Sequence, residues 1–289
     1  MSALPADLIA LALAMGLEIT EVLHRTDKTL LASGTLSGQR VAVKCLLDPD
    51  PFWAEKWRHE VDVYEVFAES PPPLRVPRLL YTDGARLLVL EWVDGQRLDD
   101  DRYPQRALNT QETDAVLGCV RSFNQWPAPG TGFEVVFDYQ DRFRRYRDYG
   151  YLTDADHDAL ARLLRRVGEP RQVNHGDPLP SNILLDPSLG TTLLDWEYTG
   201  LFLPGFDLAM LHTQIGAHSP LIKTRIDDLA AESGTEDAFA VNLAAVLTRE
   251  LRMHHELPDG PLRGSRLPLI EAAWAHARDR LHQQASRRP

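Results

Sequence analysis

Three oxygen-bearing side chains stand at an informative spacing in the second half of the chain. Asp177 is followed five residues later by Asn182, and a second carboxylate, Asp195, follows thirteen residues after that. A carboxylate can take the proton of a hydroxyl nucleophile, and an asparagine and an aspartate offer the hard oxygen ligands that magnesium takes. This order and spacing predict a phosphoryl-transfer site in which Asp177 faces the acceptor hydroxyl and Asn182 and Asp195 hold the metal.

The residues around this stretch predict a loop held between short strands. The runs at 171–173, 183–185 and 191–194 can each form a strand, and the turn-rich segment 186–190 would join the last two as a hairpin. Pro178 and Pro180 exclude a helix through the loop. A loop fixed at both ends holds carboxylates in place, as positional catalysis requires. The alternative is a polar surface loop with chance spacing, and the combination of motifs disfavours it.

The two motifs resemble those of known kinases. Protein kinases carry H-R-D-x-x-x-x-N followed by D-F-G, whereas this chain has His175-Gly176-Asp177 and then Asp195-Trp196-Glu197. H-G-D-x-x-x-x-N followed by D-x-E resembles the aminoglycoside phosphotransferase and choline kinase family, whose members phosphorylate small molecules. The resemblance covers roughly residues 20–215. It implies an α+β, two-lobed protein-kinase-like fold, with a small antiparallel-sheet N-lobe at residues 1–92 and a mostly helical C-lobe at residues 93–289.

The N-terminal third contains the elements expected to bind the nucleotide. Strands are predicted at 21–25, 29–36 and 40–47, and the last contains Val41-Ala42-Val43-Lys44, similar to the V-A-I-K strand of protein kinases. The resemblance implies that Lys44 contacts the α- and β-phosphates of ATP. The loop at 25–29 lacks the glycine-rich sequence of protein kinases, which favours the small-molecule kinases. Helical periodicity predicts a helix at 50–67. The resemblance implies that Glu60 on this helix is the partner of Lys44, in competition with the neighbouring glutamates at 55, 65 and 69.

A hairpin and a hinge are expected next. Strands at 78–81 and 86–90 flank the turn signal Asp83-Gly84. The resemblance implies that Leu90 is the gatekeeper, and that the adenine bonds the carbonyl of Glu91 and the N–H of Val93.

From about residue 96 the pattern becomes helical. Capping sequences at Asn109 and Thr153 introduce helices at about 115–126 and from residue 154, and helices resume from residue 204 to the end. The resemblance implies that Asp207 braces the catalytic loop through backbone hydrogen bonds. His175 is expected to be structural or to face the substrate, and Glu197 to lie near the metal or to face the substrate.

Two polar clusters have weaker functional signals. His254-His255-Glu256 lacks the H-E-x-x-H spacing of a metal site, so we expect a polar helix end. Arginines 142, 144, 145 and 147 are expected to form a solvated helix face, with an anion contact as the alternative.

Composition narrows the class of protein. The chain has 289 residues, of which 44% are hydrophobic, enough for a sizeable core. Its net charge of −11 argues against nucleic acid as a partner and is compatible with a cationic acceptor. No apolar run reaches membrane-spanning length, and Leu8–Met15 is expected to be a short amphipathic helix. Cys45 and Cys119 indicate neither a disulfide framework nor a metal site, so we expect a cytoplasmic protein.

These observations predict an O-phosphotransferase that uses ATP, or GTP as the alternative, together with Mg²⁺. The expected acceptor is an aminoglycoside or a related antibiotic. The enzyme would then have a role in antibiotic resistance. A metabolite kinase for choline, homoserine, a sugar or a nucleoside would share every motif. A protein kinase is disfavoured because A-P-E is absent and residues 200–207 leave almost no activation segment. A non-catalytic nucleotide-binding scaffold is disfavoured because all four motif residues are intact. The sequence indicates no oligomeric state.

Overall fold

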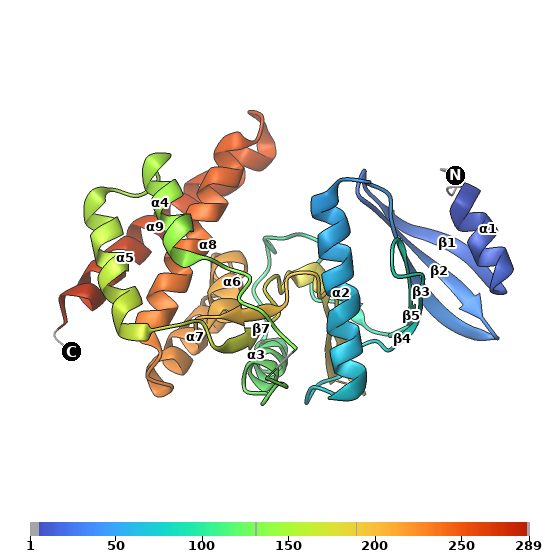
Figure 1. The fold of residues 1–289 in the computed structure, drawn as a ribbon. Coiled ribbons are helices and arrows are strands. Elements are labelled where there is room, and N and C mark those ends of the chain that lie inside the picture. The colour runs from blue at the N-terminus through green and yellow to red at the C-terminus, as the bar shows by residue number, and fades with distance from the viewer. Residues whose placement is uncertain (1–5, 131, 189, 288–289) are drawn as a thin grey trace.

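The computed structural model of the chain describes residues 6–130, 132–188 and 190–287. A twisted antiparallel sheet lies at one end of the molecule and a larger helical part at the other, with helix α2 (Pro51–Glu69) beside the sheet (Figure 1). This confirms the predicted α+β architecture of a small sheet lobe followed by a mostly helical lobe.

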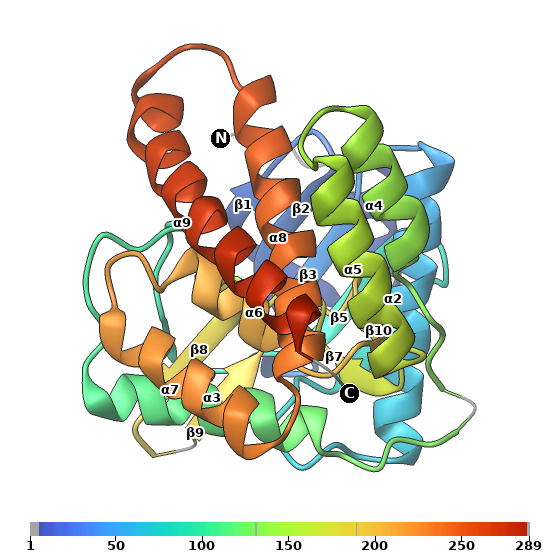
Figure 2. The same ribbon diagram turned by 90° about the vertical axis from the view of Figure 1, so that its left-hand side faces the viewer.

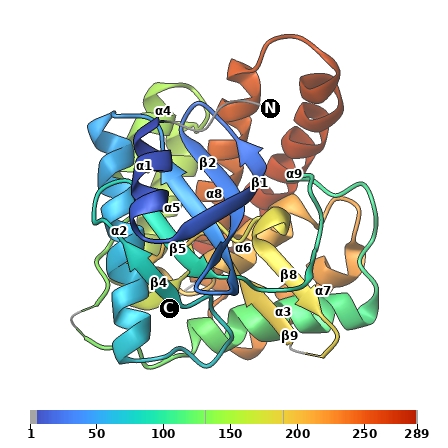
Figure 3. The same ribbon diagram turned by 90° about the vertical axis from the view of Figure 1, so that its right-hand side faces the viewer.

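The first sheet has five strands in the order β1-β2-β3-β5-β4, and all of its neighbours are antiparallel. Strands β1 (Leu17–Arg25), β2 (Thr29–Leu36) and β3 (Gln39–Leu46) form a meander, and β4 (Leu79–Thr82) and β5 (Leu87–Glu91) form the predicted hairpin. Strand β1 begins four residues earlier than predicted, since its start pairs with the end of β2. The expected N-terminal helix is α1 (Ala6–Ala14), whose Leu8 and Ala12 pack on the sheet (Figure 3).

Helix α2 contacts both parts of the molecule. Asp50 caps its N-terminus by accepting a hydrogen bond from the N–H of Phe52. Trp57 and Val61 pack against the sheet, in one small cluster. Further along, Phe67 lies among aromatic rings of the helical lobe, with its ring centroid 4.8 Å from that of Trp196. The C-terminal half of this helix is therefore part of the core of the helical lobe.

The helical lobe confirms the predicted helical pattern of the C-terminal two thirds. Asn109 and Thr153 both form capping boxes, with Glu112 and Asp156 as their partners, so the first helix begins at residue 110 rather than 115. Helices α8 and α9 lie antiparallel to each other at the far end of this lobe (Figure 2). The helices of the lobe are α3 (Thr110–Asn124), α4 (Tyr139–Asp148), α5 (Asp154–Val167), α6 (Phe206–Gln214), α7 (Pro220–Glu232), α8 (Glu236–Glu256) and α9 (Pro261–Ser286).

Two small sheets hold the motif-bearing loops. The predicted hairpin is present as β8 (Ile183–Asp186) and β9 (Gly190–Leu193), and β6 (Gln96–Arg97) adds a third strand to it. Strand β7 (Gln172–Asn174) pairs with β10 (Gly200–Phe202), which the sequence did not predict. The loop from His175 to Asn182 thus starts at one sheet and ends, through a 3₁₀ turn (Pro180–Asn182), at the other. Within the described ranges, no helix has the length and apolar character needed to cross a bilayer.

Candidate active site

Lys44 brings together two of the predicted site residues. Its Nζ donates to Glu60 Oε2 and to Asp195 Oδ1, each at 2.6 Å. The three residues come from β3, from α2 and from the loop that follows β9. The expected Lys44–Glu60 pair is therefore present, and the glutamates at 55, 65 and 69 make no such contact.

The charges of this group depend on one another. Burial lowers the pKa of Lys44, but attraction to Asp195 and Glu60 outweighs it and holds the pKa well above its usual value. Burial raises the pKa of Asp195, but its contact with Lys44 is stronger and lowers it. The lysine is thus an ammonium held between carboxylates, ready to neutralise anionic oxygens.

Asp207 fixes the backbone of the loop before Asp177. Its carboxylate accepts hydrogen bonds from the N–H groups of His175 (2.8 Å) and Gly176 (2.9 Å), and from the side chain of Asn124 (3.0 Å). Asp207 is fully buried, and burial raises its pKa to about 6 against the pull of these donors. This is the bracing arrangement that the family resemblance implies for this residue.

His175 ties the two motif loops to each other. Its Nε2 lies 2.9 Å from the carbonyl oxygen of Leu194, and its Nδ1 lies 3.3 Å from the N–H of Asp177. Burial lowers the pKa of this imidazole to about 4, so it is neutral at pH 7 and can donate at Nε2 while it accepts at Nδ1. The ring packs against Trp196, whose side chain is fully buried. These contacts connect the two motif loops through one buried ring.

Asp177 and Asn182 lie at the two ends of the same short loop. The Asn182 side-chain N–H donates to the backbone carbonyl of Asp177 at 3.2 Å. Burial raises the pKa of the Asp177 carboxyl, while Arg102 and Arg249 pull it down. A carboxylate with a raised pKa is a stronger base, and a general base works best when its pKa lies close to the operating pH.

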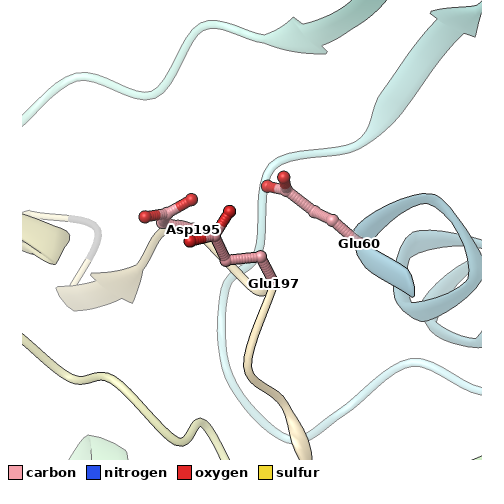
Figure 4. A group of neighbouring side chains, drawn as sticks. All are labelled: Glu60, Asp195 and Glu197. Atoms are coloured by element: carbon pink, nitrogen blue, oxygen red, sulfur yellow. The ribbon is translucent and has the colours of Figure 1, made fainter. Parts of the chain in front are cut away.

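The donor atoms near Asp195 suit a hard divalent cation. Glu60, Asp195 and Glu197 can each bring one carboxylate oxygen within 4.8 Å of the others (Figure 4). The side-chain nitrogen of Asn182 donates to the carbonyl oxygen of Asp177. The side-chain oxygen of Asn182 is therefore the atom that could bind a metal ion. Burial raises the pKa of Glu197 to about 7. Asp195 also has a positive φ of 68°, an uncommon backbone conformation for a non-glycine residue and one that clusters at functional sites. Carboxylate and amide oxygens are the ligands that magnesium takes, so the residues fit the predicted metal.

The three residues expected to face the adenine lie where the sheet leads into the helical lobe. Leu90 is buried in β5 and packs in the main core. Glu91 ends that strand, and its side chain accepts a hydrogen bond from Arg78 at 3.2 Å. Val93 follows in an irregular, half-buried segment. Their role in nucleotide binding stays a prediction.

Three charged residues near Asp177 escaped the sequence analysis. Glu250 of α8 is fully buried, and its Oε1 accepts hydrogen bonds from Arg102 (2.9 Å) and Arg249 (3.1 Å). Tyr103 donates to the other oxygen of the same carboxylate. Arg102 lies in a loop and Arg249 in a helix almost 150 residues away, so no local pattern connects them.

The arginines of α4 were expected to form a solvated face. Arg144 and Arg145 are more than half exposed and pair with Asp141 of the same helix, which agrees with that expectation. Arg142 differs, because its guanidinium stacks on the ring of Phe137 at 4.3 Å and burial lowers its pKa. His254 also departs from the expected polar helix end. It is buried, and its ring lies against Tyr103 because the helix end is covered by the loop that carries Arg102.

Gly176→Ala is expected to lower the free energy of unfolding by about 3 kcal/mol or more and to reduce activity strongly. Gly176 has a φ of +84°, and a Cβ at this position would lie 2.2 Å from the carbonyl oxygen of Tyr198. The strained backbone and the clash with another backbone segment would both displace the loop that carries Asp177. Urea unfolding and steady-state kinetics would measure the two effects.

Gly150→Ala is the matched control for this substitution. Gly150 has a similar φ of +80°, but a Cβ there would meet no atom within 4 Å. It should therefore lose only the cost of the left-handed conformation, about 1–2 kcal/mol, and keep full activity. If both variants lost the same free energy of unfolding, the close approach of Tyr198 to Gly176 would contribute nothing to the cost of the Gly176→Ala substitution.

Known proteins resemble this chain in sequence pattern and in fold. A sequence model described as the phosphotransferase enzyme family matches residues 38–241. A search of curated protein sequences gives no match. Among solved structures, the GDP and kanamycin complex of APH(2")-IIia has 12% identity and a TM-score of 0.61, with 96% of this chain and 98% of that chain covered. The ADP-bound aminoglycoside phosphotransferase APH(2'')-Ib has 13% identity and a TM-score of 0.60, with 95% and 99% covered. A ternary complex of a thermostable mutant of aminoglycoside phosphotransferase APH(4)-Ia with ADP and hygromycin B has 16% identity and a TM-score of 0.55, with 97% and 99% covered.

Proposed function

The chain belongs to the phosphotransferase enzyme family, and from this premise we propose that it transfers the γ-phosphoryl group of ATP to the hydroxyl of a small molecule with the help of magnesium. The observation that carries the proposal is the position of Lys44, 2.6 Å from both Glu60 and Asp195. It joins a strand, a helix and a motif loop into one charged site. Such a site can orient and neutralise phosphates, which is most of what phosphoryl transfer asks of a protein.

The proposed roles follow from the contacts of each residue. Asp177 orients the acceptor hydroxyl and accepts its proton, supported by the raised pKa that burial gives it. Lys44 neutralises the α- and β-phosphates, and Glu60 fixes the position of its amine. Asn182 and Asp195 would hold magnesium, which when bound supplies positive charge beside the phosphates. Asp207 and His175 keep the loop of Asp177 in shape.

The nucleotide would lie between the sheet and the helical lobe. We propose that the lobes meet between residues 92 and 93, with the adenine bonded to the backbone of Glu91 and Val93 and with Leu90 beside it. ATP is the proposed co-substrate and GTP the alternative, and similar solved structures contain ADP or GDP. We propose a cytoplasmic enzyme, because these nucleotides are abundant there.

Two acceptor classes follow from these observations. An aminoglycoside or related antibiotic is the first, supported by similar folds that hold kanamycin or hygromycin B. A metabolite such as homoserine, choline, a sugar or a nucleoside is the second. One observation favours a metabolite over a polycationic antibiotic, since Arg102 and Arg249 are the charged neighbours that lower the pKa of Asp177.

A coupled assay of ADP release tests the proposal. The purified chain with Mg-ATP is screened against aminoglycosides, other antibiotics and hydroxylated metabolites, and mass spectrometry identifies the phosphorylated product. Acceptor-dependent ADP release with a phosphate ester as product would support it. Tight binding of Mg-ATP with no phosphorylated product from any acceptor would favour a non-catalytic nucleotide-binding scaffold instead.

A further inference from the structure

Glu250 anchors two guanidinium groups whose charges act on the proposed catalytic aspartate. Burial would raise the pKa of Glu250, but attraction to Arg249 and Arg102 outweighs it and lowers the pKa to about 2, so this residue is a carboxylate. It accepts hydrogen bonds from both arginines through the same oxygen, Oε1. A single carboxylate thus pairs with two guanidinium groups, so one of the two positive charges is not balanced within this group and acts on Asp177.

The two arginines retain unused hydrogen-bond donors. Arg102 donates to Glu250 through Nη2, and Arg249 donates through Nη2 to Glu250 and to the sulfur of Met210. The Nε atoms of both groups are buried and have no partner within the described part of the chain. The two side chains as a whole are 24% and 20% exposed, so parts of them other than Nε are open to solvent. Buried donors are normally satisfied, so two unpaired Nε groups side by side are an unusual feature of the described chain.

Two contacts connect the arginines to the loop of Asp177 or to its neighbours. The segment before Arg102 is attached to that loop, since the N–H of Asp99 donates to the carbonyl of Pro180 at 3.4 Å. Arg249 reaches the same region through Met210, one turn after Asp207 on α6. The two guanidinium groups are also the positive charges that act most strongly on Asp177.

We propose that Arg102 and Arg249 form a subsite for an anionic group, a carboxylate or a phosphate, on the acceptor whose hydroxyl faces Asp177. The inference rests on the proposed phosphotransferase function and names the class of acceptor. Guanidinium groups recognise such anions through paired hydrogen bonds. The subsite would also repel an amine-bearing acceptor, contrary to what the net charge of −11 suggests. Local charge at the site governs recognition more directly than the charge of the whole chain, because solvent screens distant charges.

The acceptor is the proposed occupant rather than the nucleotide. Arg102 and Arg249 belong to the helical lobe, in the loop before α3 and in α8, whereas Lys44 comes from the sheet. The phosphates already have a cation in Lys44 and proposed metal ligands in Asn182 and Asp195. The arginines are therefore available to recognise the acceptor.

Matched acceptor pairs test this inference. Gluconate is compared with glucose, glycerate with glycerol, homoserine with its amide, and ribose 5-phosphate with ribose, and kanamycin is included as a polycation. For each compound kcat/KM is measured by ADP release, and binding is measured by calorimetry with a non-hydrolysable Mg-ATP analogue present. The variants are Arg102→Gln and Arg249→Gln, each of which leaves Glu250 paired with the other arginine and with Tyr103. Arg225→Gln is the control, since Arg225 is a half-exposed arginine that pairs with Asp114 on α3.

At least one anionic member should exceed its uncharged partner by about 10- to 100-fold in kcat/KM or in affinity, the range expected for hydrogen bonds to a charged group. Each glutamine variant should reduce that preference, and the control should keep it. If thermal melting shows that one variant does not fold, the other variant and the preference of the wild-type chain for the anionic partner test the subsite.

Four outcomes would overturn the subsite. Absence of any preference for the anionic partner, or kanamycin as the best acceptor, would do so. A rise in KM for ATP alone would assign the arginines to the nucleotide. An equal fall in kcat for all acceptors, with a shifted pH profile, would mean that they only keep Asp177 ionised. Failure of the phosphotransferase proposal is distinct, because no compound would then yield a phosphate ester.

Discussion

Asp177→Asn is expected to lower kcat by at least about 100-fold, the usual scale of a general-base contribution, while the affinity for Mg-ATP stays largely intact. The amide cannot accept the proton of the acceptor hydroxyl. It also preserves the shape of the loop, because Asn182 bonds the backbone carbonyl of residue 177 and not its side chain. The measurements are steady-state kinetics with the best acceptor and calorimetry with Mg-ATP.

Asp158→Asn is a suitable control for that variant. Asp158 is an exposed aspartate on α5, so the same chemical change there should leave kcat and nucleotide affinity unaltered. Near wild-type turnover in Asp177→Asn would remove this residue from the catalytic role. A loss of nucleotide affinity equal to the loss of turnover would instead indicate that the loop has collapsed.

Asp195→Ala is expected to abolish magnesium-dependent binding of ATP, with a loss of about 100-fold or more in affinity. The substitution would remove a charged carboxylate that is proposed to hold the magnesium, which would supply positive charge beside the phosphates. Lys44 would keep its second partner, Glu60, at 2.6 Å, so its amine should stay in place and the loss should reflect the metal. Calorimetry with ATP, with and without magnesium, measures the effect.

The Lys44→Ala variant distinguishes the contribution of the metal to ATP affinity from that of the direct contact with the phosphates. This variant should weaken ATP whether magnesium is present or absent, because it acts on the phosphates directly. Asp195→Ala should act only when magnesium is present. Unchanged Mg-ATP affinity in Asp195→Ala would place the metal elsewhere, with Glu197 as the next carboxylate to test.

The sequence predicted most of what depends on local patterns. The spacing of Asp177, Asn182 and Asp195 lies within one stretch of the chain, and the hairpin that separates the last two has clear turn signals. Apolar alternation and capping residues also indicated the five-stranded sheet and the main helices. The expected pair of Lys44 and Glu60 came from an alignment of motifs, and the structure brings the two side chains together.

Features that depend on distant segments were missed. Strand β10 has three residues and exists only because β7 lies beside it. The need for glycine at 176 arises from the approach of Tyr198, and nothing in the neighbouring sequence signals it. The group formed by Glu250 and its two arginines joins a loop to a helix. Such contacts are set by tertiary packing, which a single sequence does not reveal.

The packing of α2 bears on how the enzyme would be controlled. Glu60 projects from a helix whose C-terminal half is embedded in the helical lobe through Phe67 and its aromatic neighbours. In a kinase that is switched by swinging this helix, an activator must first bring the glutamate to the lysine. Here the chain alone completes that pair, and moving the helix away would expose a large aromatic surface to water. Its output would therefore follow the supply of acceptor and nucleotide, without an on–off switch at this helix.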